Sequence, residues 1–167
     1  MTTEIKGKVF CFGDDIDTGQ IIPGSYVVLT DPYELASHVF EDVAPEFRSQ
    51  VEQGDIIVAG KNFGTGSSRE HAPKAIKYAG ISAVIAKSFS RIFYRNAINI
   101  GLLAIVLPEA DKISKADRLT ILLEQGKIRN HTKGEEYNFA LPPQIMLDIF
   151  NAGGIIPYTL NVLKTRC

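Results

Sequence analysis

The chain has 167 residues, of which 45% are hydrophobic, so its length and composition suit about one domain with an apolar core. Its formal net charge of -1 provides no basic field for phosphate backbones or anionic lipid, and we therefore expect neither a nucleic-acid partner nor a membrane partner. No apolar run approaches the roughly 18 residues that span a bilayer, and the N-terminal MTTEIKGK lacks the apolar segment of a secretory signal, which predicts a cytoplasmic protein.

The chain begins with a strand pattern followed by a turn-rich segment. Residues 5–12 (IKGKVFCF) alternate in hydrophobicity as a strand does, and GDDIDTGQIIPG follows them. A helix is then predicted in TDPYELASHVFEDV, because Asp31 is a suitable N-cap, a proline follows it, and Glu34 is spaced to complete a capping box.

The middle of the chain predicts alternating strands and helices. Residues 55–87 contain a buried strand, a glycine-rich loop, a helix beginning near Ser67 and a second strand. Residues 90–101 (SRIFYRNAINIG) predict a further helix, with a glycine just past its end, and the apolar LLAIVL after it predicts a short strand.

The last third of the chain has a different character. Residues 118–139 contain two to three short strand-like runs separated by glycines, as in a hairpin or meander, and residues 142–154 (PPQIMLDIFNAGG) predict a helix. The sequence as a whole predicts an α/β domain in which helices cover one side of a mixed sheet and extra strands are added late in the chain.

The glycine-rich loop GTGSSREHA has a structural and a functional interpretation. Ser67 and Glu70 are spaced as in a capping box, with Ser67 as the N-cap of the following helix. Gly64 and Gly66 also lack Cβ atoms, so that backbone N–H groups can approach a small anion near a helix N-terminus that favours negative charge. The two interpretations do not exclude each other.

Polar side chains next to these glycines indicate what the anion would be. Arg69 carries a planar guanidinium that can hold a carboxylate by two hydrogen bonds, and Ser67 and Ser68 lie within two residues of it. A serine is too weakly acidic to act as a base by itself, so its alkoxide would need stabilisation by N–H groups and the nearby arginine. The loop therefore predicts a carboxylate site with a candidate reactive serine beside it.

Three motifs in this order resemble one known family. GDDIDTGQIIPG, GTGSSREHA and AVIAKSFSRIFYRNAINIGLL are similar to segments of the small subunits of isopropylmalate isomerase, in the aconitase superfamily of hydro-lyases, and the similarity extends from about residue 5 to residue 107. The resemblance implies that residues 1–167 form a single swivelling domain of β/β/α layers, docked on a larger subunit as a heterodimer or heterotetramer.

The resemblance also implies roles for the residues of the loop. Ser67 falls on the catalytic base of the family, whereas Ser68 and Arg69 fall on residues that hold a carboxylate of a small dicarboxylate substrate. The neighbouring residues are expected to support the geometry of the site without reacting: Gly64, Gly66, Glu70 and His71.

The chain has too few thiolates to hold an iron–sulfur cluster. Cys11 and Cys167 lie near opposite ends of the chain, whereas a cluster needs about four thiolates. The resemblance implies that a [4Fe-4S] cluster is carried by the large subunit, and we expect no metal in this chain and two reduced cysteines. The acidic run from Asp14 to Asp17 is interpreted as a solvated turn and not as a metal site.

The loop after the first motif bears on the substrate. Homoaconitase-type relatives carry an arginine there that pairs with a distal carboxylate, and the matching position in this chain is Val28, followed by Leu29. A buried carboxylate without a partner would cost several kcal/mol, whereas a buried isopropyl group gains roughly 1 to 2 kcal/mol. The resemblance thus implies the isomerisation of 2-isopropylmalate to 3-isopropylmalate, as in leucine biosynthesis, although residues 27–29 could instead be core or interface residues.

Alternatives remain open at this stage. Position 19 is glycine where the family usually has an acidic residue, so no role is carried over to Gly19. The chain could belong to a dehydratase of methylmalate, of dimethylmalate or of the homoaconitase type. It could also be a carboxylate-binding domain without catalysis, although such a domain would have no need of Ser67.

Overall fold

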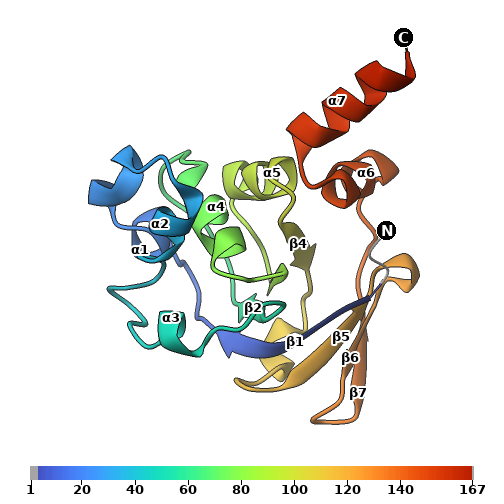
Figure 1. Cartoon of the computed structure of the whole chain (residues 1–167). Coiled ribbons are helices and arrows are strands. Elements are labelled where there is room, and N and C mark those ends of the chain that lie inside the picture. Colours follow the sequence, from blue (N-terminus) through green and yellow to red (C-terminus); the bar gives the residue numbers. More distant parts are fainter. Residues whose placement is uncertain (1–3, 167) are drawn as a thin grey trace.

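A seven-stranded mixed sheet organises the fold of this computed structural model, which describes residues 4–166 (Figure 1). The spatial order of the strands is β4-β3-β2-β1-β5-β6-β7. The strands are β1 (Glu4–Cys11), β2 (Ile56–Ala59), β3 (Ala83–Ala86), β4 (Leu103–Val106), β5 (Arg118–Leu122), β6 (Lys127–Asn130) and β7 (Glu135–Asn138). Strands β1 to β4 are parallel, and β5 to β7 continue the sheet from β1 in antiparallel pairs.

The helices lie between and after the strands in the sequence. They are α1 (Thr18–Ile21), α2 (Pro32–Ala36), α3 (Phe47–Gln50), α4 (His71–Tyr78), α5 (Arg91–Asn99), α6 (Gln144–Ala152) and α7 (Ile155–Thr165). Short 3-10 segments occur at η1 (Gly24–Val28), η2 (Ala110–Lys112) and η3 (Leu123–Gln125). No helix within residues 4–166 is long and apolar enough to cross a membrane.

Two apolar cores divide the molecule into three layers. Phe10 of β1 points into the first core, which lies between the parallel half of the sheet and helices α2 to α5. Ile5 and Val9 of the same strand point into the second core, where side chains of β2 to β4 meet those of β5 to β7. The curled sheet therefore supplies two layers and the helices supply the third, which confirms the predicted β/β/α arrangement.

The prediction that the helices cover one side of the sheet is wrong for α6. Its Leu147 and Phe150 pack against the second core, at the edge of the curled sheet and not above the parallel strands. The following helix, α7, was not predicted from the sequence; it has no buried residue and projects from the body of the protein (Figure 1).

The predicted helix at residues 30–43 is shorter than its sequence pattern. Asp31 is its N-cap, because the Asp31 carboxylate accepts the Tyr33 N–H at 2.9 Å. The helix ends after Ala36, and Phe40 adopts a left-handed φ of 56° with its ring fully buried. The predicted capping box with Glu34 does not form, since the Asp31 side chain accepts from Tyr33 instead of Glu34.

Candidate active site

The turn that carries Ser67 connects β2 with α4 and depends on glycine at position 64. Gly64 has a φ of 83°, and a Cβ there would lie 2.2 Å from Cγ of Phe93, so no larger residue fits. Its N–H donates to the carbonyl of Ile16 at 2.7 Å. The Gly64 N–H is therefore not itself available to an anion, and the glycine allows the turn to pack closely on α5.

A threonine from the first motif holds Ser67 in place. The Thr18 Oγ1 and Ser67 Oγ atoms are 3.1 Å apart, and the Ser67 backbone N–H donates to the same Thr18 Oγ1 at 3.2 Å. Thr18 is only 4% exposed, and its own N–H donates to the carbonyl of Thr65 at 2.8 Å. The start of α1 and the Ser67 turn are thus joined by three hydrogen bonds centred on Thr18.

These bonds decide how charge on Ser67 would be stabilised. The Thr18 oxygen accepts the Ser67 N–H, which leaves the Thr18 hydroxyl hydrogen to be donated elsewhere. When Ser67 loses its proton, only Thr18 can be the donor across the 3.1 Å separation between the two hydroxyl oxygens. A buried Thr18 hydroxyl is therefore a charge-assisted donor to a Ser67 alkoxide.

The predicted capping role of Ser67 is wrong. Helix α4 begins at His71 with Glu70 as its N-cap, and no side chain caps it. The Glu70 carboxylate faces Lys74 at 3.9 Å, one turn along the helix, instead of returning to the serine backbone. The Ser67 hydroxyl is hydrogen-bonded to Thr18, and Ser67 lies before the first residue of α4. It therefore does not cap the N-terminus of this helix.

Arg69 extends from the same turn toward the segment η1. A Cβ built on Gly24 would lie 3.1 Å from Nη1 of Arg69, which places the guanidinium directly against the first residue of η1. Among residues 4–166, no carboxylate forms an ion pair with Arg69. The fork is thus exposed and available to a negatively charged ligand.

Ser68 and His71 flank this constellation. The Ser68 side chain is exposed, and its carbonyl accepts from Nδ2 of Asn96 at 3.2 Å, which ties the turn to α5. His71 occupies the first position of α4, and its buried Nδ1 has no hydrogen-bond partner among the described residues. The turn is therefore tied to α5 through Asn96, and no hydrogen bond of the His71 ring supports it among the described residues.

Val28 and Leu29, predicted together from the sequence, lie in different environments. Val28 ends η1 and is 78% exposed. Leu29 is partly buried and packs against the first core. Gly24, at the other end of η1, lies near the Arg69 guanidinium, and of the two residues only Val28 is both exposed and part of η1.

The acidic run before Ser67 is built into turns, as predicted. The Asp14 carboxylate accepts the Lys61 N–H at 2.7 Å, and that of Asp15 accepts from the Asn62 amide at 3.0 Å. Asp17 caps α1 in a reciprocal box with Gln20. Within residues 4–166, no three His, Cys, Asp or Glu side chains gather as metal ligands. The expectation of two reduced cysteines stays a prediction, because Cys167 lies outside the described residues.

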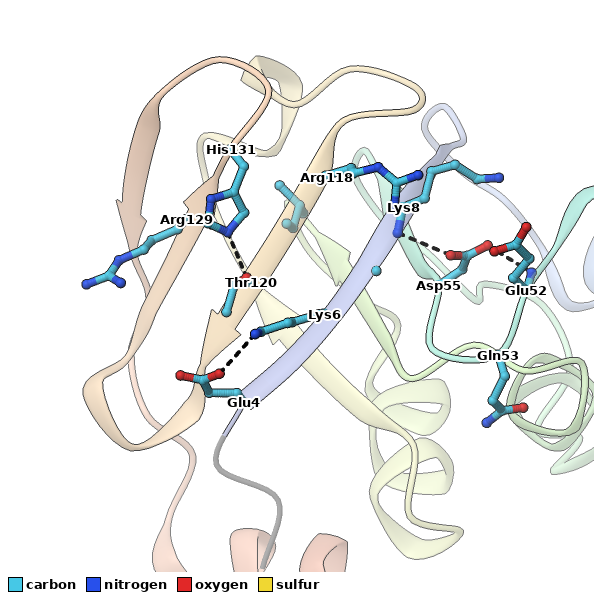
Figure 2. Close-up of a pocket in the computed structure, with 12 residues that line it drawn as sticks. Glu4, Lys6, Lys8, Glu52, Gln53, Asp55, Arg118, Thr120, Arg129 and His131 are labelled. Carbon is cyan, nitrogen blue, oxygen red and sulfur yellow. Dashed lines mark hydrogen bonds and ion pairs between the residues drawn. The ribbon is translucent and has the colours of Figure 1, made fainter.

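A charged hollow of about 440 Å³ on the outer face of β1, β5 and β6 is separate from this site (Figure 2). Two pairs of its polar side chains satisfy each other: Lys6 with Glu4 at 3.6 Å and His131 with Thr120 at 2.8 Å. No residue of the Ser67 turn lines it. The hollow therefore gives no reason to move the candidate site away from Ser67.

Thr18 was not identified as a site residue from the sequence, whereas the adjacent Gly19 was considered. Gly19 is exposed in α1, whereas Thr18 is the residue that reaches the serine. Its position in the first motif was the one indication that Thr18 matters. The motif by itself does not show that Thr18 contacts Ser67, which is 49 residues away.

Comparisons with known proteins identify relatives over nearly the full length. The family model described as the aconitase C-terminal domain matches residues 24–110. The 3-isopropylmalate dehydratase small subunit of Aquifex aeolicus is 53% identical over 168 residues, covering 99% of this chain and 100% of that protein. Small subunit 1 of the same enzyme in Archaeoglobus fulgidus is 54% identical over 156 residues, covering 93% of this chain and 97% of that protein.

Solved structures agree with the sequence relatives. The crystal structure of 3-isopropylmalate dehydratase from Methanocaldococcus jannaschii has a TM-score of 0.92 at 47% identity and covers 98% of both chains. Aconitase X of Thermococcus kodakaraensis has a TM-score of 0.51 at 14% identity, covering 82% of this chain and 90% of that chain, which is a likeness of fold alone.

Proposed function

The chain belongs to the family of 3-isopropylmalate dehydratase small subunits, hydro-lyase subunits of leucine biosynthesis, and on this basis we propose that Ser67 is the base of the reaction. The observation that carries the proposal is the pair of bonds between Thr18 and Ser67, at 3.1 Å to Oγ and 3.2 Å from the N–H. A buried hydroxyl donor aimed at a serine oxygen is the arrangement that a serine base requires.

The proposed chemistry breaks a C–H bond next to the carbon that carries the substrate hydroxyl. Ser67, as the alkoxide, takes the proton on Oγ while Thr18 donates to the same oxygen. The electron pair of the C–H bond forms the double bond as hydroxide leaves. The serine then returns the proton during rehydration with the opposite regiochemistry, which converts 2-isopropylmalate to 3-isopropylmalate.

Arg69 and Ser68 would hold a substrate carboxylate beside the base. Arg69 has no carboxylate partner within the described residues, so a substrate carboxylate can occupy both arms of its fork without displacing one. Val28, exposed on the segment that touches Arg69, is assigned to the apolar substituent of the substrate. Leu29 supports this segment from the core.

The exposure of the turn supports a requirement for a partner. Residues 66–70 are exposed in this chain, and in open water the hydrogen bonds of a serine alkoxide compete with those of the solvent. We assign the covering surface to a large subunit that holds a [4Fe-4S] cluster. When bound there, the cluster would supply a Lewis acid for the departing hydroxide. Residues 1–167 would act as one swivelling domain of this cytoplasmic assembly.

The test is reconstitution. The purified chain is mixed with its cognate large subunit under anaerobic conditions, and the conversion of 2-isopropylmalate to 3-isopropylmalate is followed. We expect conversion only when both subunits are present. Conversion by the chain alone after removal of iron would reject the two-subunit proposal, and failure of a correctly assembled, cluster-loaded pair to act on any substituted malate would reject the assigned reaction.

A further inference from the structure

The segment η1 has little to hold it in its observed conformation. None of its five residues, from Gly24 to Val28, is buried, and no side chain caps it. At its two ends the Tyr26 N–H donates to the carbonyl of Pro23 and the Leu29 N–H donates to that of Tyr26, each at 3.0 Å. Short 3-10 segments have poor hydrogen-bond geometry and are marginal without tertiary support. Something outside the segment must therefore fix it.

Tyr26 is partly buried and packs against the first core, and its ring also contacts the turn after α2. The ring of Tyr26 stacks on the imidazole of His38, with centroids 3.7 Å apart and planes at 9°. The His38 Nδ1 atom lies 2.7 Å from Oε2 of Glu41, which fixes the plane of the imidazole. The proximity of Glu41 raises the pKa of Tyr26, and Tyr26 and His38 lower the pKa of Glu41. The three side chains thus form one contact group.

His38 and Glu41, which belong to the turn after α2, are held in place by the first core. His38 is followed by Val39 and Phe40, both completely buried in the first core. The Phe40 N–H donates to the carbonyl of Ile21 at 2.8 Å, which ties the turn to the end of α1. Because His38 and Glu41 are held by this buried stretch, they offer a fixed surface to which Tyr26 of η1 attaches.

We propose that Tyr26, His38 and Glu41 form a clamp that positions η1, and through it Val28 and the Arg69 fork, for recognition of the substrate. Gly24, two residues before Tyr26, lies against Arg69, so a shift of η1 changes the position of the guanidinium as well as that of Val28. None of the three clamp residues needs to touch the substrate. The inference rests on the proposed function of Ser67 and Arg69 and identifies positioning residues for the same site.

The clamp is tested with His38→Ala and Tyr26→Ala in the chain assembled with its large subunit. Loss of the stacked pair should raise KM for 2-isopropylmalate about three- to tenfold, as expected for an aromatic contact, and change kcat less than about twofold. Tyr26→Phe keeps the stacked ring and should recover most of the affinity. His131→Ala removes an imidazole bonded to Thr120 on the outer sheet face and should leave KM unchanged.

A second measurement is independent of activity. Hydrogen exchange of the Tyr26 and Leu29 amides in the isolated chain should become at least about fivefold faster in His38→Ala, because both amides close η1. Unchanged exchange together with an unchanged KM in either folded alanine variant would overturn the clamp, as would a loss confined to kcat. If Ser67→Ala kept normal turnover, the function would fail while the exchange result still decided whether the clamp holds η1.

Discussion

The hydroxyl oxygens of Thr18 and Ser67 lie 3.1 Å apart, although 49 residues separate them in the sequence. Thr18 also accepts the Ser67 N–H, so that one buried side chain holds both the backbone and the hydroxyl of Ser67. A fixed serine conformation and a donor to its oxygen come from the same residue.

Thr18→Val should therefore impair the reaction in the assembled enzyme without removing the base itself. Loss of one donor to a developing charge costs about 10²- to 10³-fold in kcat in comparable sites. Thr18→Ser keeps the hydroxyl and should stay within roughly tenfold of the wild type. Steady-state kinetics of both variants provide the check, and equal kcat values for Val and Ser would contradict a role for the Thr18 hydroxyl.

Ser67→Ala should lower kcat by several orders of magnitude, because it removes the proposed base. The cost in stability should be below about 1 kcal/mol, since Ser67 does not cap α4. Ser49→Ala removes an exposed hydroxyl in α3 that donates to the backbone carbonyl of Glu46, and it provides a matched control. Normal turnover by a Ser67→Ala enzyme that assembles and melts like the wild type would exclude the serine from the chemistry.

Arg69→Lys should weaken substrate binding more than it slows catalysis. A lysine keeps the charge but cannot make the bidentate contact, so we expect KM to rise roughly tenfold or more with a smaller change in kcat. Arg118→Lys on β5 changes an arginine of the separate hollow and is the control (Figure 2). A KM unaffected by Arg69→Lys would mean that the fork does not hold the carboxylate.

Val28→Arg should shift specificity toward a substrate with a third carboxylate. A charge-assisted pair contributes roughly 1.5 to 3 kcal/mol, so the ratio of kcat/KM values between a tricarboxylic analogue and 2-isopropylmalate should change by about one to two orders of magnitude. Both substrates compete in one reaction of the assembled enzyme. Val43→Arg, at another exposed valine, should leave the ratio unchanged, and an unchanged ratio for Val28→Arg would place Val28 away from the substrate.

Tyr137 should make the fold sensitive to alkaline pH. Burial, together with its hydrogen bond to Glu135, raises the pKa of Tyr137 to about 12, whereas an unfolded tyrosine has a pKa near 10. The folded state holds this proton more tightly, so the contribution to stability is complete below about pH 10 and is lost as the pH rises to about 12. Between about pH 10 and pH 12, the free energy of unfolding measured in urea should fall further in the wild type and in Tyr158→Phe than in Tyr137→Phe. The difference should be on the order of 2 kcal/mol. Parallel curves for all three proteins would contradict the assignment.

Local patterns were sufficient for the strands and for the position of the turn that carries Ser67. The alternating residues 5–12 became β1, apolar runs became β2 to β4, and Asp31 caps α2 as its residue type suggests. These features depend on neighbours a few residues apart, which a sequence displays directly. For the same reason the clustering of Ser67, Ser68 and Arg69 in one turn follows from the sequence alone.

Features that depend on distant contacts were decided only by the tertiary structure. The spacing of Ser67 and Glu70 favoured a cap, but Thr18 engages the serine and α4 begins at His71. Anion approach was the reason predicted from the sequence for glycine at position 64, and the structure adds a second reason, the packing of Phe93 against it. Helix caps and anion sites are predicted from adjacent residues. The local sequence around Ser67 and Gly64 cannot show that the Thr18 hydroxyl and the Phe93 ring, which belong to other elements, contact them. Which of several chemically suitable partners a residue takes is fixed by the packing of the whole sheet and its helices.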